Sequence, residues 1–330
     1  NRPFITAGNP ELRIETVQKF NAGVEFALWQ NRARFTFDAY HNKTIDLFVN
    51  RRLGANSGFG GNSLPINAGS MRNQGAEFTL SVDVVRTKLV EFTLGLNHAI
   101  NSNKITDLGG VPEYTSGTFQ IKEGVAYGTH YTYHYLGADP ATGRPMYEKL
   151  DGTTGYTLGD AGRFAKFGTY LPKHVGGFTA DIRFGKLTVS ALFSYQFDVV
   201  RSNNIENWVT RGTPGYHTSV NASRRLLTEQ WEKPGDQKFY QAYIYDRDFT
   251  SSDLQDAKFL RFRNLNVAYQ IPAIGIKGMN VIKSARVYAQ LQNIAIWSPW
   301  RGPDPEDGNN ISLNEFPNPR IFVAGIDINF

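Results

Sequence analysis

Aromatic and histidine side chains alternate in the segment THYTYHYLG, where the sequence first offers residues suited to binding chemistry. In an extended chain this spacing places Tyr131, Tyr133 and Tyr135 on one face, and His130 and His134 on the other. Aromatic faces can stack on sugars or peptides, so we expect the tyrosines to contact a substrate. The alternative is that they only pack the segment against its neighbours. The histidines would converge on a metal only in a helix, so we expect no metal site here.

Further candidates for substrate contact are the tryptophans Trp231, Trp297 and Trp300. Trp231 lies in the segment TSVNASRRLLTEQWEKPGD, which predicts a short helix with Ser219 or Asn221 as its N-cap. Pro234 and Gly235 would end that helix. The helix could contact a substrate or a lid, or it could only pack a loop.

A third segment, WSPWRGPDPEDGNN, gathers the carboxylates Asp304, Glu306 and Asp307. Their spacing is not that of an EF-hand loop, so a stiff, solvated loop is favoured over a calcium site. The chain has no G-x-S-x-G, P-loop or H-E-x-x-H motif and no cysteine, so we predict neither catalysis nor a cofactor. The net charge of +5 is spread along the sequence without a nucleic-acid-binding signature, and we expect no nucleic-acid partner.

The elements that must position these residues are predicted by strict alternation of apolar and polar side chains, the pattern of a β-strand with two different faces. Aromatic residues reach 13% and glycines number 32, a mixture that favours strands and turns. No run of 18 apolar residues could form a membrane-spanning helix. The alternation occurs in nine segments: 19–29, 31–42, 73–84, 88–99, 176–184, 186–197, 264–272, 285–293 and 320–330.

The apolar side of each segment could form the core of a soluble sandwich or face lipid in a membrane barrel. The connections decide between these, because short and long ones alternate along the chain. The long ones lie near 49–70, 102–173, 199–255 and 295–316. Outer-membrane barrels have short periplasmic turns and long extracellular loops. We therefore predict an all-β fold, an antiparallel transmembrane β-barrel segment, with Phe92 and Val189 among its lipid-facing residues.

A complete single-chain barrel of this kind has an even number of strands, so nine strands do not close. They leave two open sheet edges, whose unpaired backbone groups lipid cannot satisfy. We therefore expect residues 1–330 to form the C-terminal part of a larger barrel that another chain or a missing segment completes. Residue 1 would then be an internal cut in a longer precursor. Outer-membrane assembly machinery would recognise the terminal Phe330, and Trp29, beside a short turn, would lie in the interfacial belt.

Six segments in a fixed order carry a family resemblance: NPELRIETVQKFNAGVEF (9–26), NAGSMRNQGAEFTLSV (67–82), YLGADPATGRPMYEKLDG (135–152), DAKFLRFRNLNVAYQIP (256–272), ARVYAQLQNIAIW with GPDPE (285–306), and the terminal VAGIDINF. Together they resemble the C-terminal barrel of the SusC-like family of TonB-dependent transporters. The resemblance implies a 22-stranded barrel, about the size of plugged outer-membrane transporters. This chain would supply its last nine strands.

By that resemblance, the whole protein imports glycan fragments, peptides or similar nutrients across the outer membrane of a Gram-negative cell. Its partners would be the remaining N-terminal barrel strands and plug domain, outer-membrane lipid, TonB through an N-terminal region, and a SusD-like lipoprotein over the external mouth. The plug is expected to lie outside this chain. Two alternatives stay open: a passive outer-membrane porin wall, and a soluble β-rich carbohydrate-binding or adhesin module.

Overall fold

The computed structural model describes residues 8–57, 63–212, 221–272, 274–276, 279–306, 308–312 and 315–329. Its largest element is an antiparallel sheet of nine strands that follow one another in chain order. They are β1 (Thr16–Leu28), β2 (Ala33–Arg52), β3 (Ser63–Arg86), β4 (Val90–Asp107), β12 (His174–Phe184), β13 (Leu187–Phe197), β16 (Phe259–Ile271), β19 (Ser284–Trp297) and β20 (Ile321–Asn329). The strands coincide with the nine alternating segments, so the predicted all-β, antiparallel sheet is confirmed.

The register of the strands joins the apolar sides of all nine into one continuous face. Phe92 of β4 lies opposite Ile182 of β12, Ile182 lies opposite Val189 of β13, and Val189 lies opposite Val267 of β16. Directly opposite residues of antiparallel strands point to the same side of the sheet. We call this side the apolar face, and the other side, which carries Thr93 and its equivalents, the polar face.

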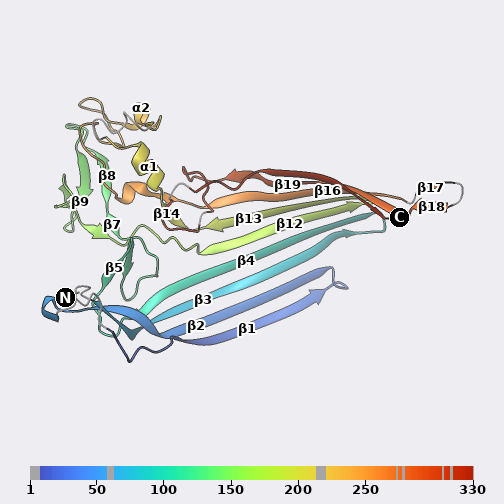
Figure 1. Ribbon diagram of the computed structural model, residues 1–330, viewed down its shortest axis with the longest axis horizontal. Coiled ribbons are helices and arrows are strands. Elements are labelled where there is room, and N and C mark those ends of the chain that lie inside the picture. Colours follow the sequence, from blue (N-terminus) through green and yellow to red (C-terminus); the bar gives the residue numbers. More distant parts are fainter. Residues whose placement is uncertain are drawn as a thin grey trace, which may run out of the picture.

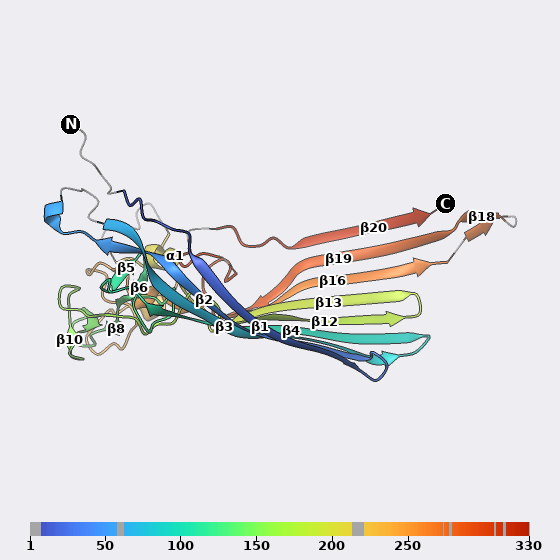
Figure 2. The same cartoon turned by 90° about the horizontal axis from the view of Figure 1, so that it is seen from below.

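The sheet is a single curved layer, and Figures 1 and 2 show its strands side by side with no second large sheet stacked on them. The other sheets formed by the described residues have two or three strands each. Leu94 and Ile182 belong to interior strands, yet they are 42% and 41% exposed. Phe193 stacks on both Phe178 and Phe262, with ring centroids 4.5 and 4.4 Å apart. The apolar face is therefore not the interior of a sandwich.

The long connections gather at one end of the sheet (Figure 1). The strands extend further toward them than the alternation indicated, because β2 continues to Arg52 and β3 begins at Ser63. Little of the long connection expected at 49–70 remains outside the strands. In these extensions polar residues such as Lys43 and Arg72 occupy the side of the sheet that is apolar elsewhere, and the ladder continues after the alternating pattern has ended.

Short elements subdivide the long connections. A 3₁₀ turn lies at Ala55–Ser57, and β5 (Tyr114–Ser116), β6 (Phe119–Ile121), β7 (Thr132–Tyr133), β8 (Tyr135–Ala138), β9 (Pro145–Glu148), β10 (Thr154–Gly155) and β11 (Arg163–Phe164) lie between β4 and β12. Between β13 and β16 lie β14 (Val200–Ser202), α1 (Asn204–Val209), α2 (Leu226–Glu229), a 3₁₀ turn at Ser251–Asp253, and β15 (Leu254–Asp256). The alternation pattern predicted none of these short strands.

The helix predicted in the TSVNAS segment is shorter than expected. It covers only Leu226–Glu229, and its N-cap residue, Arg225, makes no side-chain capping hydrogen bond. Asn221 lies before the helix, and Ser219 lies outside the described residues. The helix ends at Gln230, whose backbone is extended and pairs with a neighbouring segment, so tertiary pairing overrides the helical preference.

The opposite end of the sheet carries the short turns. Trp29, Gln30 and Asn31 all have positive φ in the turn between β1 and β2, and Trp29 is 72% exposed. The connection after β16 is not a simple turn, because Ile274–Ile276 (β17) and Met279–Ile282 (β18) pair as a small hairpin that protrudes from this end (Figure 1).

The edges of the nine-stranded sheet are β1 and β20. The last described residue of β20 is Asn329, so Phe330, expected to be recognised during assembly, lies outside the described residues. No helix in the described part of the chain is long and apolar enough to cross a membrane.

Candidate substrate site in the loop cap

The three longest connections, residues 108–173, 198–258 and 298–320, form a loop cap over one end of the sheet (Figures 1 and 2). The first connection folds over the polar face. It packs on the wall through a buried apolar cluster of Val49, Ile105, Leu108, Val111 and Ile121. Asn103, two residues before Ile105 and on the same face, accepts a hydrogen bond from the backbone N–H of Tyr127 at 2.6 Å.

The last connection is held against the polar face by ion pairs. Arg261 of β16 is 3% exposed and pairs with Asp304 and, at 3.0 Å, with Glu306. Arg263 pairs with Glu306 and donates to the Ser194 hydroxyl at 2.8 Å. Removing one partner of a buried pair leaves an uncompensated charge that costs about 3–5 kcal/mol, so these contacts fix the loop on the wall.

These ion pairs also show how the acidic loop segment is used. Asp304 and Glu306, two of the carboxylates weighed for calcium, contact arginine, while Asp307 lies outside the described residues. Across the part of the chain that the structure describes, no group of three or more acidic or histidine side chains is placed to hold a metal ion.

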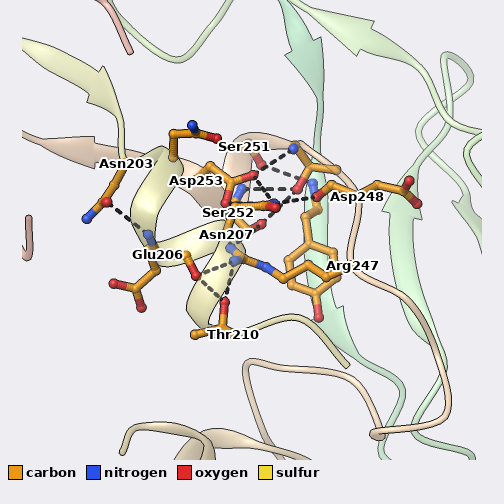
Figure 3. A network of polar contacts seen from close by, with 12 residues as sticks. Asn203, Glu206, Asn207, Thr210, Arg247, Asp248, Ser251, Ser252 and Asp253 are labelled. Carbon is orange, nitrogen blue, oxygen red and sulfur yellow. Dashed lines mark hydrogen bonds and ion pairs between the residues drawn. The ribbon is translucent and has the colours of Figure 1, made fainter. Parts of the chain in front are cut away.

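The middle connection is organised by a buried polar network, drawn in Figure 3. Arg247 pairs with Asp253 at 2.7 Å and donates to the backbone oxygen of Glu206 at 3.2 Å and the Ser252 hydroxyl at 3.1 Å. Asn207 donates to the two carboxylate oxygens of Asp253 at 3.3 and 3.2 Å. Through these contacts the network can hold α1 against the chain that leads into β15, although the buried Oδ1 of Asn207 has no hydrogen-bond partner among the described residues.

Glu206 extends this network to α2. Arg225 pairs with both Glu206 and Glu229, and the Tyr240 hydroxyl donates to Glu206 Oε1 at 2.6 Å. Burial, together with the nearby Glu206 carboxylate, raises the pKa of Tyr240, so its hydroxyl remains a donor. Asn203 caps α1 by accepting a hydrogen bond from the backbone N–H of Glu206 at 3.0 Å.

The three connections meet around a cavity of about 320 Å³. Its lining includes Thr118, Tyr131 and Arg163 from the first connection, Asn204 and Phe249 from the second, and Ile311 from the third. Asn310 donates to the Thr118 hydroxyl at 2.8 Å and so joins the third connection to the first. A volume of about 300 Å³ is at the lower end of small-molecule sites.

Arg163 brings two of the predicted tyrosines together, and of these only Tyr131 lines the cavity. β11 pairs with β7, so Arg163 lies opposite Tyr133. Its guanidinium carbon lies 4.9 Å from the ring centroid of Tyr133 and 5.6 Å from that of Tyr131. Arg163 is exposed and forms no ion pair with any described residue. An accessible guanidinium beside aromatic faces can bind a carboxylate and stack a planar group.

Tyr135, the third tyrosine of the segment, is a packing residue. It is 8% exposed, and its hydroxyl donates to the backbone oxygen of Phe239 at 2.6 Å. Burial raises the pKa of Tyr135. Trp231 also packs within the loop cap: its indole N–H donates to the Pro140 carbonyl at 3.1 Å, and a Cβ added at Gly143 would meet its ring at 2.4 Å.

The other two tryptophans also lie apart from the cavity lining. Trp297 is 54% exposed and lies opposite Leu260, which in turn lies opposite Tyr195 on the apolar face. Trp300 is 8% exposed and packs in a small cluster with Val199 and Ala257. Of the six predicted contact residues, the structure brings together only Tyr131 and Tyr133.

The two histidines of the segment make separate contacts. His130 is buried, and its Nε2 lies 2.7 Å from the Val200 carbonyl oxygen, so this nitrogen donates. Burial lowers the pKa of His130. His134 contacts the Glu148 carboxylate, and the hydrogen bond from Lys166 is the main reason why the pKa of Glu148 is lowered.

Arg163 is the main feature of the site that the sequence did not reveal. Its partners Tyr131 and Tyr133 lie about thirty residues earlier, and no local pattern joins them. The start of α1 could have been found, because Asn203 and Glu206 have the spacing of an N-cap and the acidic third residue of a helix.

A family model described as TonB dependent receptor-like, beta-barrel, matches residues 1–294. TonB-dependent receptor P26 of Formosa agariphila is 26% identical over 98% of this chain, and TonB-dependent receptor SusC of Bacteroides thetaiotaomicron is 24% identical over 98%. The solved structure of the RagAB peptide transporter is 28% identical over 98% of this chain, with a TM-score of 0.85. The RagAB peptide importer in its open-open state gives a TM-score of 0.87 at the same identity and coverage.

The chain spans about a third of the length of the proteins that it matches. It covers 35% of receptor P26, 33% of SusC and 36% of the matched RagAB chain.

Proposed function

The chain belongs to the TonB dependent receptor-like β-barrel family, as its sequence resemblance indicated, and we propose that it forms part of the wall and the loop cap of an outer-membrane importer. This family consists of outer-membrane proteins of Gram-negative bacteria. The observation that carries the proposal is the continuous apolar face, which no other part of the described chain covers. In this proposal the apolar face contacts the hydrocarbon of the outer membrane, and the polar face lines the lumen.

Strand lengths support this orientation. A membrane-crossing strand needs about 9–11 residues. β12 and β13 have 11 residues each, whereas β2 and β3 have 20 and 24 and would extend above the bilayer on the extracellular side. The edges β1 and β20 would pair with further strands of the importer, because lipid leaves an open sheet edge unsatisfied.

We propose that the cavity at Arg163 contributes to binding of a peptide on its way into the barrel. The titles of the RagAB structures name a peptide transporter and a peptide importer, and those chains share 28% identity with this one. Arg163 could bind a peptide carboxylate while Tyr131 offers an aromatic face to a side chain or peptide group. Glycan fragments are the alternative substrate class.

The proposed partners follow from the same relatives. A plug domain would fill the lumen, TonB would supply energy from the periplasmic side, and a SusD-like lipoprotein would close the mouth above the loop cap. The passive porin is less well supported than the importer, because the relatives are named for TonB dependence. The soluble binding module is not supported by a single-layer sheet with an exposed apolar face.

Uptake measurements on Arg163→Gln test this proposal. The full-length importer is produced with its partner lipoprotein in a Gram-negative host, and uptake of a labelled peptide with a free terminal carboxylate is followed. Loss of a charge-assisted hydrogen bond should reduce peptide affinity about tenfold or more. The C-terminally amidated peptide should show a smaller effect.

Arg144→Gln is the matched control. Arg144 also lies over an aromatic ring of the same connection, 4.9 Å from the centroid of Tyr156, but it is not among the residues that line the cavity. It should leave uptake unchanged. Equal uptake by the Arg163→Gln and unsubstituted proteins would contradict the peptide-binding role, and uptake that persists without TonB would contradict the importer itself.

A further inference from the structure

A row of basic side chains crosses three adjacent strands on the same side as the apolar face, beyond the end of that face. Lys43 of β2 lies directly opposite Arg72 of β3, and Arg72 lies opposite Lys104 of β4. The Cβ atoms of such cross-strand neighbours are about 5 Å apart. We call these residues the basic row. On each strand the basic residue is the fourth beyond the last apolar residue of the face: Ala39, Ala76 and Ile100.

A row of polar side chains that contains no lysine, arginine or carboxylate separates the basic row from the apolar face. His41 lies opposite Gln74, and Gln74 lies opposite Ser102. All three strands therefore show the same order toward the loop cap: apolar residues, then a histidine, glutamine or serine, then a lysine or arginine. Hydrocarbon, interface and charged headgroups follow one another in this order in a bilayer.

The height of the basic row fits the headgroup layer. Four residues of strand span about 13 Å, which corresponds to about 10 Å of height at a tilt of about 40°. The headgroup region adds about 5–8 Å on each side of the hydrocarbon. The long side chains of lysine and arginine can cover the remaining distance by extending toward the lipid phosphates.

The charges of the basic row are not compensated within the described residues. None of the three side chains forms an ion pair with a described carboxylate, whereas Arg261 and Arg263 on the polar face are both paired. Lys43 and Lys104 are exposed and Arg72 is half-buried. Like charges on directly opposite strand positions repel each other, so an external anion would stabilise this arrangement.

We infer that the basic row binds the phosphate groups of an anionic lipid in the outer leaflet. This inference depends on the proposed function, because it requires the apolar face to lie in the bilayer. A lipid can satisfy both parts of the surface at once: its phosphates contact the cations, and its acyl chains contact the apolar residues below them. One of these is Phe20, which lies opposite His41 and is 67% exposed.

The inference is tested by lipid binding to the full-length importer in phosphatidylcholine nanodiscs, with bis-phosphorylated lipid A as the titrated probe. Binding is counted by native mass spectrometry. The triple variant Lys43→Gln/Arg72→Gln/Lys104→Gln should bind lipid A with an affinity reduced on the order of a hundredfold, since each cation near a charged membrane surface contributes a factor of about five. The single variant Arg72→Gln should lose about fivefold, and it keeps the test informative if the triple variant assembles poorly.

A second triple variant, Lys19→Gln/Arg34→Gln/Arg286→Gln, is the matched control. It removes the same charge from the polar face of the same wall and should bind lipid A like the unsubstituted protein. Equal affinities of the basic-row variants and the unsubstituted protein would overturn the inference, as would an equal loss in the control. Displacement of bound lipid A by millimolar inorganic phosphate would show that the basic row binds a free anion and not a lipid. This result would also overturn the inference. Successful insertion with no basic-row effect would leave the proposed function intact, whereas a protein that stays out of the bilayer would contradict both.

Discussion

Neighbouring residues of one strand have opposite environments in this sheet. Phe92 lies opposite Ile182 on the apolar face. The next residue, Thr93, lies on the polar face, where its hydroxyl donates to Asp83 Oδ1 at 2.9 Å. A substitution should therefore have very different effects at these two adjacent positions.

We predict that Phe92→Arg destabilises the assembled barrel by about 1–2 kcal/mol, because Phe92 is the third residue of β4 and the cost of an arginine on the lipid face falls from about 2–4 kcal/mol at the bilayer midplane to about 0–1 near the interfaces. Thr93→Arg should be tolerated, because its guanidinium would extend into the lumen and could pair with Asp83. Chemical unfolding of the full-length protein from lipid vesicles measures both effects.

The pair Val189 and Ser190 repeats the comparison on β13, with Val189 on the apolar face and Ser190 opposite Asp181 on the other. Val189→Arg should reproduce the damage of Phe92→Arg, and Ser190→Arg should reproduce the tolerance of Thr93→Arg. Equal damage from both members of a pair would contradict the assignment of the faces.

Strands and loops differ in how far the sequence predicts them. Each strand of the sheet separates two media, so every residue on it takes one of two environments, and alternation alone reveals the nine strands. The extensions of β2 and β3 lose this signal, because polar residues such as Lys43 and Arg72 stand on the side that is apolar in the rest of the strands.

The loop cap depends on contacts between residues far apart in the sequence. Arg247 contacts Glu206, which precedes it by 41 residues, and Asp253, which follows it. Arg163 contacts Tyr131 and Tyr133 because β7 and β11 pair. No local spacing encodes such partners. This explains why the sequence predicted Tyr131, which lines the cavity, but not Arg163, which contacts it there.

The loop cap should become less stable in mild acid. Burial lowers the pKa of His130 below its usual value of 6.5, because protonation would place a charge in a buried site. The hydrogen bond from Nε2 to the Val200 carbonyl acts in the opposite direction and offsets only part of this effect. A lowered pKa in the folded state means that the stabilising contribution is present above pH 6.5 and is lost as the pH falls toward the folded-state pKa. Hydrogen exchange of residues 128–132 and 199–202, corrected for intrinsic rates, should therefore accelerate on acidification.

His130→Gln provides the control for this prediction. Its amide N–H can still donate to the Val200 carbonyl, but it does not titrate. The pH dependence of exchange in these segments should therefore weaken strongly in this variant. Identical pH profiles for the variant and the unsubstituted protein would show that His130 is not the responsible group.

The whole molecule combines a two-faced wall with a cap that covers one of its ends. The loop cap packs on the polar face through the Ile105 cluster and the Arg261 ion pairs, while the apolar face carries exposed aromatic and aliphatic side chains. This asymmetry fits a barrel with lipid outside and a substrate path inside, and the basic row would lie at the outer side of the lipid headgroups.

The central claim is that lipid contacts the apolar face, and single-cysteine spin labels along β4 test it most directly. This chain has no cysteine, so each label introduced into it reports one position, once any cysteine elsewhere in the full-length protein has been replaced. In lipid vesicles, collision with oxygen should be frequent at Phe92, Leu94 and Leu96 and infrequent at Thr93 and Asn97. Oxygen accessibility without this alternation, or with the opposite alternation, would contradict the account.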